Sequence, residues 1–260
     1  MPWIDVDGAA NMRDVAGIRT SDGRTVQPGK LLRSDNLQDL TPADISLLRT
    51  LGLTDVIDLR RPAESGSTGP GPLNSQPWVR IHQLSLFRES EPQNTAQTMT
   101  QVLPPSALPW IEHGDELNAP ATSPYLAYLA SRPDSVVSAL RVLAQAPGAT
   151  MVHCAAGKDR TGTIVALALL LVGVEPAPII EDYLATDERI EAVLARLRST
   201  STYQDVLSRP VADYRPSREL MADFIEQTAP GGDVSPLLDY LGKNGWTTTD
   251  TAQLRAKLIA

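Results

Sequence analysis

One stretch of this sequence, from His153 to Gly162, places a cysteine and an arginine where a phosphate group could lie between them. It reads HCAAGKDRTG, so five residues separate Cys154 from Arg160. A cysteine thiolate is a strong nucleophile, and a guanidinium can bind two oxygens of one phosphate. The spacing therefore predicts cysteine-dependent hydrolysis of a phosphate ester.

The elements on either side would place this stretch at the start of a helix. Residues 149–152 are a short apolar run typical of a buried strand, and residues 161–174 have the length and composition of a buried helix. Free backbone N–H groups and the positive end of a helix dipole favour a dianion at such a turn. The same field, with Lys158 and Arg160, would hold Cys154 as a thiolate. The inner rim of the loop is kept open by three small residues, Ala155, Ala156 and Gly157.

The loop resembles the signature of the protein tyrosine phosphatase superfamily, H-C-x5-R-[S/T], here His153, Cys154, Arg160 and Thr161. Its ten-residue form is similar to bacterial tyrosine and dual-specificity phosphatases of the PtpB type. The resemblance extends over most of the chain and includes NMRDVAG at 11–17, LRS at 32–34, LGLTDVIDLR at 51–60 and DYL at 182–184. It implies one phosphatase domain over residues 1–260, with a three-layer α/β fold, a central, mainly parallel sheet flanked by helices, and a helical lid.

The resemblance also implies a role for each loop residue. Cys154 would be the nucleophile that becomes a phosphocysteine, and Arg160 would clamp the phosphate. His153 would orient the loop through a hydrogen bond to backbone, and Thr161 would hydrogen-bond the Cys154 sulfur and help it leave in the second step. The cysteine mechanism needs no metal or cofactor. The residues expected to bind phosphate are Ala155, Ala156, Gly157, Lys158, Asp159, Arg160 and Thr161.

The general acid must come from an unusual place. Many tyrosine phosphatases use an aspartate after Trp-Pro on a separate loop, but no tryptophan in this chain is followed by proline. We expect Asp159, inside the loop, to protonate the leaving group. Lys158 and Arg160 favour its charged form, whereas an incoming phosphate dianion favours its protonated form. The alternative is that Asp159 pairs with a neighbouring cation and only shapes the loop.

Lys158 widens the expected range of substrates beyond phosphotyrosine proteins. A lysine in this loop resembles phosphatases that also accept phosphoinositides, and phosphoserine and phosphothreonine are further candidates. The alternative is that Lys158 only strengthens the positive potential around a single phosphate. For the chain as a whole, the alternative to an enzyme is a catalytically silent phosphate-binding module of the same fold.

Two charged residues at the end of a predicted strand could support the loop. A strand over residues 55–59 ends beside Arg60, and the carboxyl ends of parallel strands line the ligand crevice in α/β sheets. We expect Asp58 to brace Arg160 or the loop, and Arg60 to do the same or to meet substrate. The alternative is a solvated strand end.

A long helix is predicted over residues 178–198, where apolar residues 190, 193, 194 and 197 recur at helical spacing. In PtpB-type phosphatases the matching segment covers the active site, so residues 187–215 are expected to be a helical lid that gates substrate. The alternative is that this apolar stripe only packs on the core. Residues 88–122 are polar and interrupted by prolines, and are expected to be a long surface excursion.

Composition limits the other functions. With 260 residues, 42% of them hydrophobic, the chain can bury one full core. Its net charge of -8 argues against a broad basic surface for nucleic acid. A single cysteine excludes an internal disulfide and a cysteine-rich zinc site. We expect no transmembrane segment and no signal peptide, and hence a cytoplasmic protein or one exported without a recognisable signal.

Overall fold

The computed structural model describes residues 2–88, 123–200, 202–203 and 210–260. A sheet of strands in the order β1-β2-β5-β3-β4 forms its centre. β1 runs antiparallel to β2, and the other strands are parallel to their neighbours. The expected mainly parallel sheet is therefore confirmed. Its strands are β1 (Arg13–Asp14), β2 (Leu31–Ser34), β3 (Leu53–Asp58), β4 (Arg80–Gln83) and β5 (Ala149–His153).

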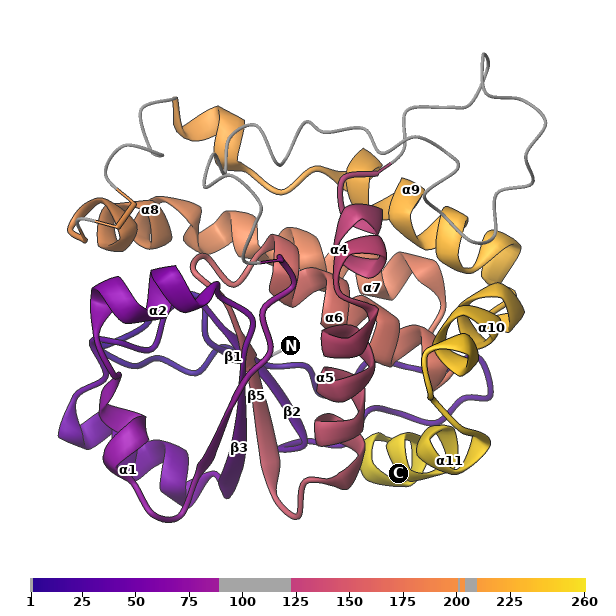
Figure 1. Ribbon diagram of the computed structural model, residues 1–260, viewed down its shortest axis with the longest axis horizontal. Coiled ribbons are helices and arrows are strands. Elements are labelled where there is room, and N and C mark those ends of the chain that lie inside the picture. Colours follow the sequence, from indigo (N-terminus) through magenta and orange to yellow (C-terminus); the bar gives the residue numbers. More distant parts are fainter. Residues whose placement is uncertain (1, 89–122, 201, 204–209) are drawn as a thin grey trace.

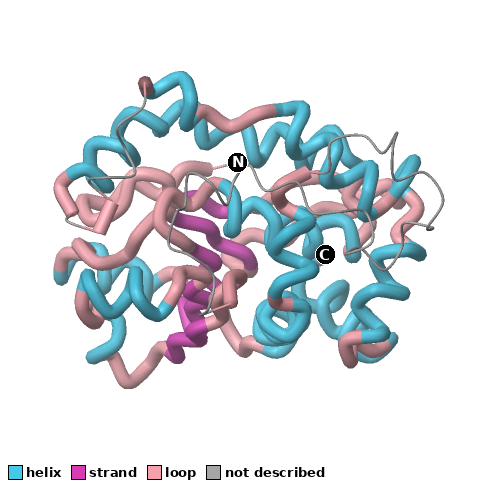
Figure 2. The backbone as a smooth tube through the Cα atoms, turned by 45° about the horizontal axis from the view of Figure 1, so that its top comes forward, coloured by secondary structure: helices cyan, strands magenta, loops and turns pink. Residues whose placement is uncertain are grey.

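Helices enclose the sheet on both faces (Figures 1 and 2). On one face, α1 (Pro42–Thr50) packs against β3, and on the other α5 (Pro133–Gln145) and α6 (Asp159–Leu171) pack against β3, β5 and β2. α11 (Thr248–Leu258) packs against α5 and α6. The other helices are α2 (Pro62–Thr68), α4 (Leu126–Ser131), α7 (Pro176–Leu184), α8 (Ile190–Arg198), α9 (Arg218–Thr228) and α10 (Ser235–Lys243), with the 3-10 helices η1 (Pro72–Ser75), η3 (Ala185–Arg189), η5 (Val211–Tyr214) and η6 (Pro230–Gly232).

The strands divide their apolar side chains between two cores. Ile57 and Val152 belong to the large cluster that includes α5 and α6, whereas their neighbours Val56 and Met151 belong to a smaller cluster with Leu48 of α1. This division follows from strand geometry, because successive side chains point to opposite faces. It explains why the strands read as continuous apolar runs, as expected for a sheet covered on both faces.

The single helix expected over residues 178–198 is wrong. α7 ends at Leu184, a 3-10 helix follows, and α8 begins at Ile190. The break is held from outside: Thr186 is fully buried and accepts a hydrogen bond from Arg13 at 3.2 Å, and Arg13 also pairs with Asp182 of α7 at 3.2 Å. A contact with the N-terminal segment thus redirects the chain, and the apolar periodicity gives no sign of it.

The parallel register brings the ends of three strands together. Ser34 of β2 and Asp58 of β3 both lie opposite His153 of β5, which is the central strand. The loop after β5 is therefore flanked by the segments that follow β2 and β3. α8 lies above this edge of the sheet, whereas α9 packs against α7 on the helical side of the molecule (Figure 1).

Two expectations concern regions that the structure describes only in part. The surface excursion predicted for residues 88–122 lies, after Arg88, outside the described residues, as do positions 201 and 204–209 of the predicted lid. Of the helices that are described, none combines the length and the apolar character needed to cross a membrane.

Candidate active site

The predicted phosphate-binding loop connects β5 directly to α6. Cys154 is 2% exposed and Arg160 is 9% exposed, so both lie almost enclosed. Gly157 adopts a positive φ of 67°, and a Cβ there would come within 2.4 Å of the Ser34 carbonyl oxygen. A residue with a side chain would therefore be strained and would also clash with β2. Glycine at this position lets the loop turn tightly against the neighbouring strand.

The loop's carbonyl oxygens are bound from outside. In a trans peptide the following N–H points opposite to the carbonyl, so the amides of residues 156–158 point away from those outer partners. These amides and the N-terminus of α6 form a concave set of donors suited to an anion. The outer bonds run from Asn36 N to Ala155 O (3.0 Å), from Asn11 Nδ2 to Ala156 O (3.0 Å) and from Arg33 Nη2 to Gly157 O (2.7 Å).

Arg160 is held by Glu64, a residue that the sequence analysis did not select. Nη1 of Arg160 donates to Oε2 of Glu64 at 2.7 Å, and Nη2 donates to Oε1 at 3.0 Å. Burial raises the pKa of Glu64, but the Arg160 charge outweighs it and lowers that pKa below its usual value. The opposite edge of the guanidinium, Nε–H with the second N–H of Nη2, has the geometry to bind two oxygens of one anion.

A local signal could have drawn attention to Glu64. Pro62 occupies the first turn of α2, and the Glu64 carboxylate accepts a hydrogen bond from the Arg61 backbone N–H at 2.8 Å. A proline followed two residues later by glutamate is typical of a helix start. That pattern predicts a helix after β3, but not that its glutamate reaches Arg160.

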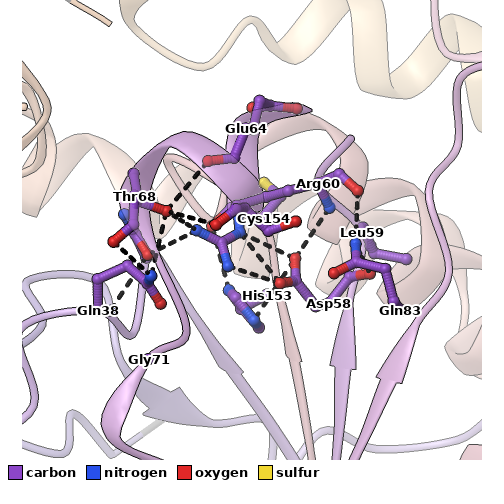
Figure 3. Close-up of polar contacts among 12 residues, drawn as sticks. Gln38, Asp58, Leu59, Arg60, Glu64, Thr68, Gly71, Gln83, His153 and Cys154 are labelled. Carbon is purple, nitrogen blue, oxygen red and sulfur yellow. Dashed lines mark hydrogen bonds and ion pairs between the residues drawn. The ribbon is translucent and has the colours of Figure 1, made fainter. Parts of the chain in front are cut away.

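His153 and Asp58 support the loop from below (Figure 3). The Nδ1 atom of His153 lies 3.2 Å from the Cys154 carbonyl oxygen, the expected contact with backbone. Its Nε2 atom lies 3.6 Å from Oδ1 of Asp58. Burial lowers the pKa of His153 to about 4, so the ring is neutral at neutral pH. Of the two roles expected for Asp58, the structure contains the contact with the loop and not the one with Arg160.

Arg60 folds back onto Asp58. Its Nε and Nη2 atoms donate to the two carboxylate oxygens at 2.9 and 2.6 Å, and its Nη1 atom donates to Thr68 at 3.3 Å (Figure 3). Nη1 also donates to the Asn36 side chain at 3.1 Å. Burial raises the pKa of Asp58, but the charges of protonated His153 and of Arg60 lower it to about 2. Arg60 is 3% exposed and its guanidinium is bound to Asp58, Asn36 and Thr68, so in this structure it braces the strand ends.

Asp159 is the first residue of α6 and is oriented mainly by a tyrosine. Its Oδ1 atom accepts a hydrogen bond from the Tyr125 hydroxyl at 2.8 Å, whereas its Oδ2 atom lies 3.6 Å from Nζ of Lys158. The Lys158 ammonium donates to the Tyr214 carbonyl oxygen at 2.6 Å. The ion pair with Lys158 that the alternative interpretation requires is therefore longer, at 3.6 Å, than the hydrogen bond from Tyr125, at 2.8 Å.

Thr161 does not make its expected contact. Its Oγ1 atom is buried and has no hydrogen-bond partner among the residues that the structure describes, so the bond to the Cys154 sulfur is absent. A threonine in a helix commonly bonds the carbonyl four residues earlier. Here that carbonyl belongs to Gly157 and is already bound by Arg33 and Asn11. The hydroxyl is left unbonded beside the loop.

The apolar side of α8 packs against the loop. Ala155 shares one hydrophobic cluster with Tyr203 and with the buried residues of α8, and Ala156 packs against that cluster. The Tyr203 hydroxyl donates to Oε1 of Glu64 at 3.0 Å, so the segment after α8 reaches the partner of Arg160. The residues of α8 in the cluster are Ile190, Val193, Leu194 and Leu197.

The chain is similar to known phosphatases over its whole length. A model described as "Tyrosine phosphatase family" matches residues 4–260. The triple specificity protein phosphatase PtpB of Mycobacterium tuberculosis is 33% identical over 206 residues, which cover 74% of this chain and 72% of that protein. A protein of Cupriavidus necator named as a tyrosine-protein phosphatase is 29% identical over 262 residues, covering 98% and 87%. A tyrosine-protein phosphatase of Nostoc commune is 30% identical over 162 residues, covering 62% and 49%.

These matches confirm the expected fold and the expected kind of enzyme, a cysteine-dependent tyrosine phosphatase with bacterial relatives. The chain belongs to the tyrosine phosphatase family.

Proposed function

We propose that this chain hydrolyses phosphotyrosine in proteins, and also phosphoserine, phosphothreonine and phosphoinositides, through a phosphocysteine on Cys154. The observation that carries the proposal is the loop itself. The carbonyl oxygens of residues 155–157 accept hydrogen bonds from Asn36, Asn11 and Arg33 outside the loop. The N–H groups of residues 156–158 therefore point away from these three donors. The breadth of substrates is supported by the relative from Mycobacterium tuberculosis, named a triple specificity phosphatase, and by Lys158 in the loop.

Hydrolysis then takes two steps, formation of the phosphocysteine and its hydrolysis. In the first, the Cys154 thiolate attacks phosphorus, the S–P bond forms, the bond to the leaving oxygen breaks, and Asp159 gives its proton to that oxygen. In the second, water attacks phosphorus, Asp159 takes one proton from the water, and the S–P bond breaks to release inorganic phosphate and the thiolate. Arg160 and the loop amides bind the equatorial oxygens throughout and stabilise the charge of the transition state.

Residues 187–215 serve as the lid over this site. Support comes from the apolar side of α8, which contacts Ala155 and Ala156, and from the part of the segment just after α8, where Tyr203 reaches Glu64. Thr202 also lies 2.6 Å from Ser67 of α2, hydroxyl to hydroxyl. Such a cover excludes water and oxidants from Cys154 and must open to admit a substrate as large as a protein.

Lys158 becomes available to substrate when this segment opens. The residue is 7% exposed, and its ammonium donates a hydrogen bond to the Tyr214 carbonyl oxygen of η5, within the proposed lid. Release of that carbonyl frees a cation next to the phosphate clamp, where a second phosphate on an inositol ring could bind it.

A substrate panel tests the proposal. Phosphotyrosine, phosphoserine and phosphothreonine peptides and phosphoinositide vesicles are offered to the wild-type chain and to Cys154→Ser. We expect turnover by the wild type, no turnover by the variant, and a phosphorylated cysteine in rapidly quenched wild-type reactions. A wild-type chain that binds phosphate but hydrolyses none of the panel would instead be the catalytically silent module.

A further inference from the structure

We infer that Tyr125 is a positioning residue for the general acid, holding the carboxyl group of Asp159 so that its transferable proton is carried on Oδ2. The inference rests on the proposed role of Asp159 as the acid. Tyr125 stands 34 positions before Asp159, outside the loop and outside every motif that the sequence analysis selected.

The direction of the hydrogen bonds follows from counting hydrogens. The Tyr125 hydroxyl lies 2.8 Å from Oδ1 of Asp159 and 2.6 Å from the Tyr183 hydroxyl. A phenol has one hydrogen to donate, and an ionised carboxylate can only accept. The hydrogen of Tyr125 therefore goes to Asp159, and Tyr183 must donate to Tyr125. The three groups form a chain that runs in one direction, from Tyr183 of α7 to the loop.

The phenol of Tyr125 is held rigidly in this place. The residue precedes α4, is 2% exposed, and its ring is enclosed by other aromatic rings. Tyr128 stacks on it at a centroid distance of 6.3 Å, whereas Tyr183 and Phe224 contact it edge to face at 6.1 and 6.0 Å. Rings packed in this way cannot turn without displacing their neighbours. The oxygen that faces Asp159 thus belongs to the rigid core and not to the loop.

A fixed donor decides where the acid proton resides. As long as the Tyr183–Tyr125–Asp159 chain keeps this direction, Oδ1 accepts the hydrogen of Tyr125, and a proton that Asp159 acquires goes to Oδ2. Without the Tyr125 hydroxyl, the carboxyl group could rotate towards the cations beside it, Lys158 and Arg160, and would be turned correctly for only part of the time. Tyr128 and Tyr183 also interact electrostatically with Asp159, and both keep their hydroxyls when Tyr125 is replaced by phenylalanine.

The variant Tyr125→Phe tests the inference, because it removes one oxygen and keeps the packed ring. The measurement is kcat/KM for aryl phosphates whose leaving phenols span a wide range of acidity. We expect about a tenfold loss for the most basic leaving groups and less than twofold for the most acidic, since only basic leaving groups need a positioned proton. Tyr240→Phe is the matched control: it removes a buried hydroxyl that donates to the Leu129 carbonyl at 2.7 Å, away from the loop.

A double-mutant cycle shows whether Tyr125 acts through Asp159. In an Asp159→Asn background, Tyr125→Phe should cost nothing further. Equal losses across all leaving groups, the same loss in both backgrounds, or the same change in Tyr240→Phe would each overturn the inference while leaving an active phosphatase. A wild-type chain that hydrolyses no aryl phosphate would instead overturn the proposed function, and the inference with it.

Discussion

The carboxylate of Glu64 holds the guanidinium of Arg160 through two hydrogen bonds, 2.7 and 3.0 Å long. Both side chains are nearly buried, and Tyr203 donates to the same carboxylate. In the proposed mechanism, the pair aims the other edge of Arg160 before any phosphate arrives, so substrate binding need not order the clamp. It also joins three separate parts of the chain, namely the loop, α2 and the segment after α8.

Replacing Glu64 by glutamine should therefore weaken catalysis and stability together. We expect kcat/KM for phosphotyrosine peptides to fall by about ten- to a hundredfold, because the glutamine amide offers Arg160 one acceptor oxygen in place of two and no negative charge. The free energy of unfolding in urea should fall by about 3 kcal/mol, because a buried charge loses its partner. Glu191→Gln, at an exposed position of α8, is the control and should change neither quantity. Unchanged kcat/KM in Glu64→Gln would contradict the positioning role.

Asp159→Asn should slow the enzyme in proportion to the basicity of the leaving group. A general acid contributes about a hundredfold or more where the leaving oxygen needs a proton, and little where it does not. Kinetics with a series of aryl phosphates measure this dependence directly. Equal losses on good and poor leaving groups would assign Asp159 a structural role in the loop.

Lys158→Ala should separate the two kinds of substrate. Loss of the ammonium removes a binding partner for a second phosphate, so kcat/KM for phosphoinositides should fall about tenfold more than kcat/KM for a phosphotyrosine peptide. Both activities are measured side by side on the same preparation. A proportional fall in both would mean that Lys158 only adds to the potential of the loop.

Loosening α8 should expose Cys154. Leu194 is 2% exposed and belongs to the cluster that contains Ala155, so Leu194→Ala leaves a cavity between α8 and the loop. We expect peroxide to inactivate this variant several-fold faster than the wild type, and activity on bulky substrates to rise. Leu241→Ala, in the main core, is the matched truncation, and its rate of inactivation should stay at the wild-type value. The same acceleration in both variants would mean that global loosening, and not the lid, exposes the thiol.

Stability should fall below neutral pH because of His153. Burial lowers its pKa in the folded chain from 6.5 to about 4, so the unfolded chain binds the extra proton first. This contribution is complete above about pH 6.5 and is lost as the pH falls to about 4, amounting to about 3 kcal/mol. Asp58, whose pKa falls from 3.8 to about 2, causes a second loss below that range as it becomes protonated.

Urea unfolding at a series of pH values measures the first loss. His153→Asn should flatten the dependence of unfolding free energy on pH between pH 6.5 and 4. If the free energy of unfolding of His153→Asn fell with pH as steeply as that of the wild type, the buried His153 ring would not be the source of the pH dependence.

The amino-acid sequence by itself determined the chemistry and the local frame of this protein. A cysteine, five residues and an arginine between an apolar strand and an apolar helix were sufficient to predict the loop between β5 and α6 and to propose its nucleophile and its clamp. The α1 helix was also predictable, since Thr41 and Asp44 cap its start and Gly52, at a φ of 75°, ends it. These features are local, because propensity, capping and periodicity act over one or two turns.

Only the tertiary structure decided what surrounds the loop. Glu64 reaches Arg160 across 96 positions, Arg33 reaches the Gly157 carbonyl across 124, and Tyr125 reaches Asp159 across 34. The break between α7 and α8 depends in the same way on Arg13. Such pairs follow from the order and register of the strands, which place the ends of β2, β3 and β5 at one edge. Local sequence patterns carry no information on that order, because each strand is specified by its own burial and not by its neighbour.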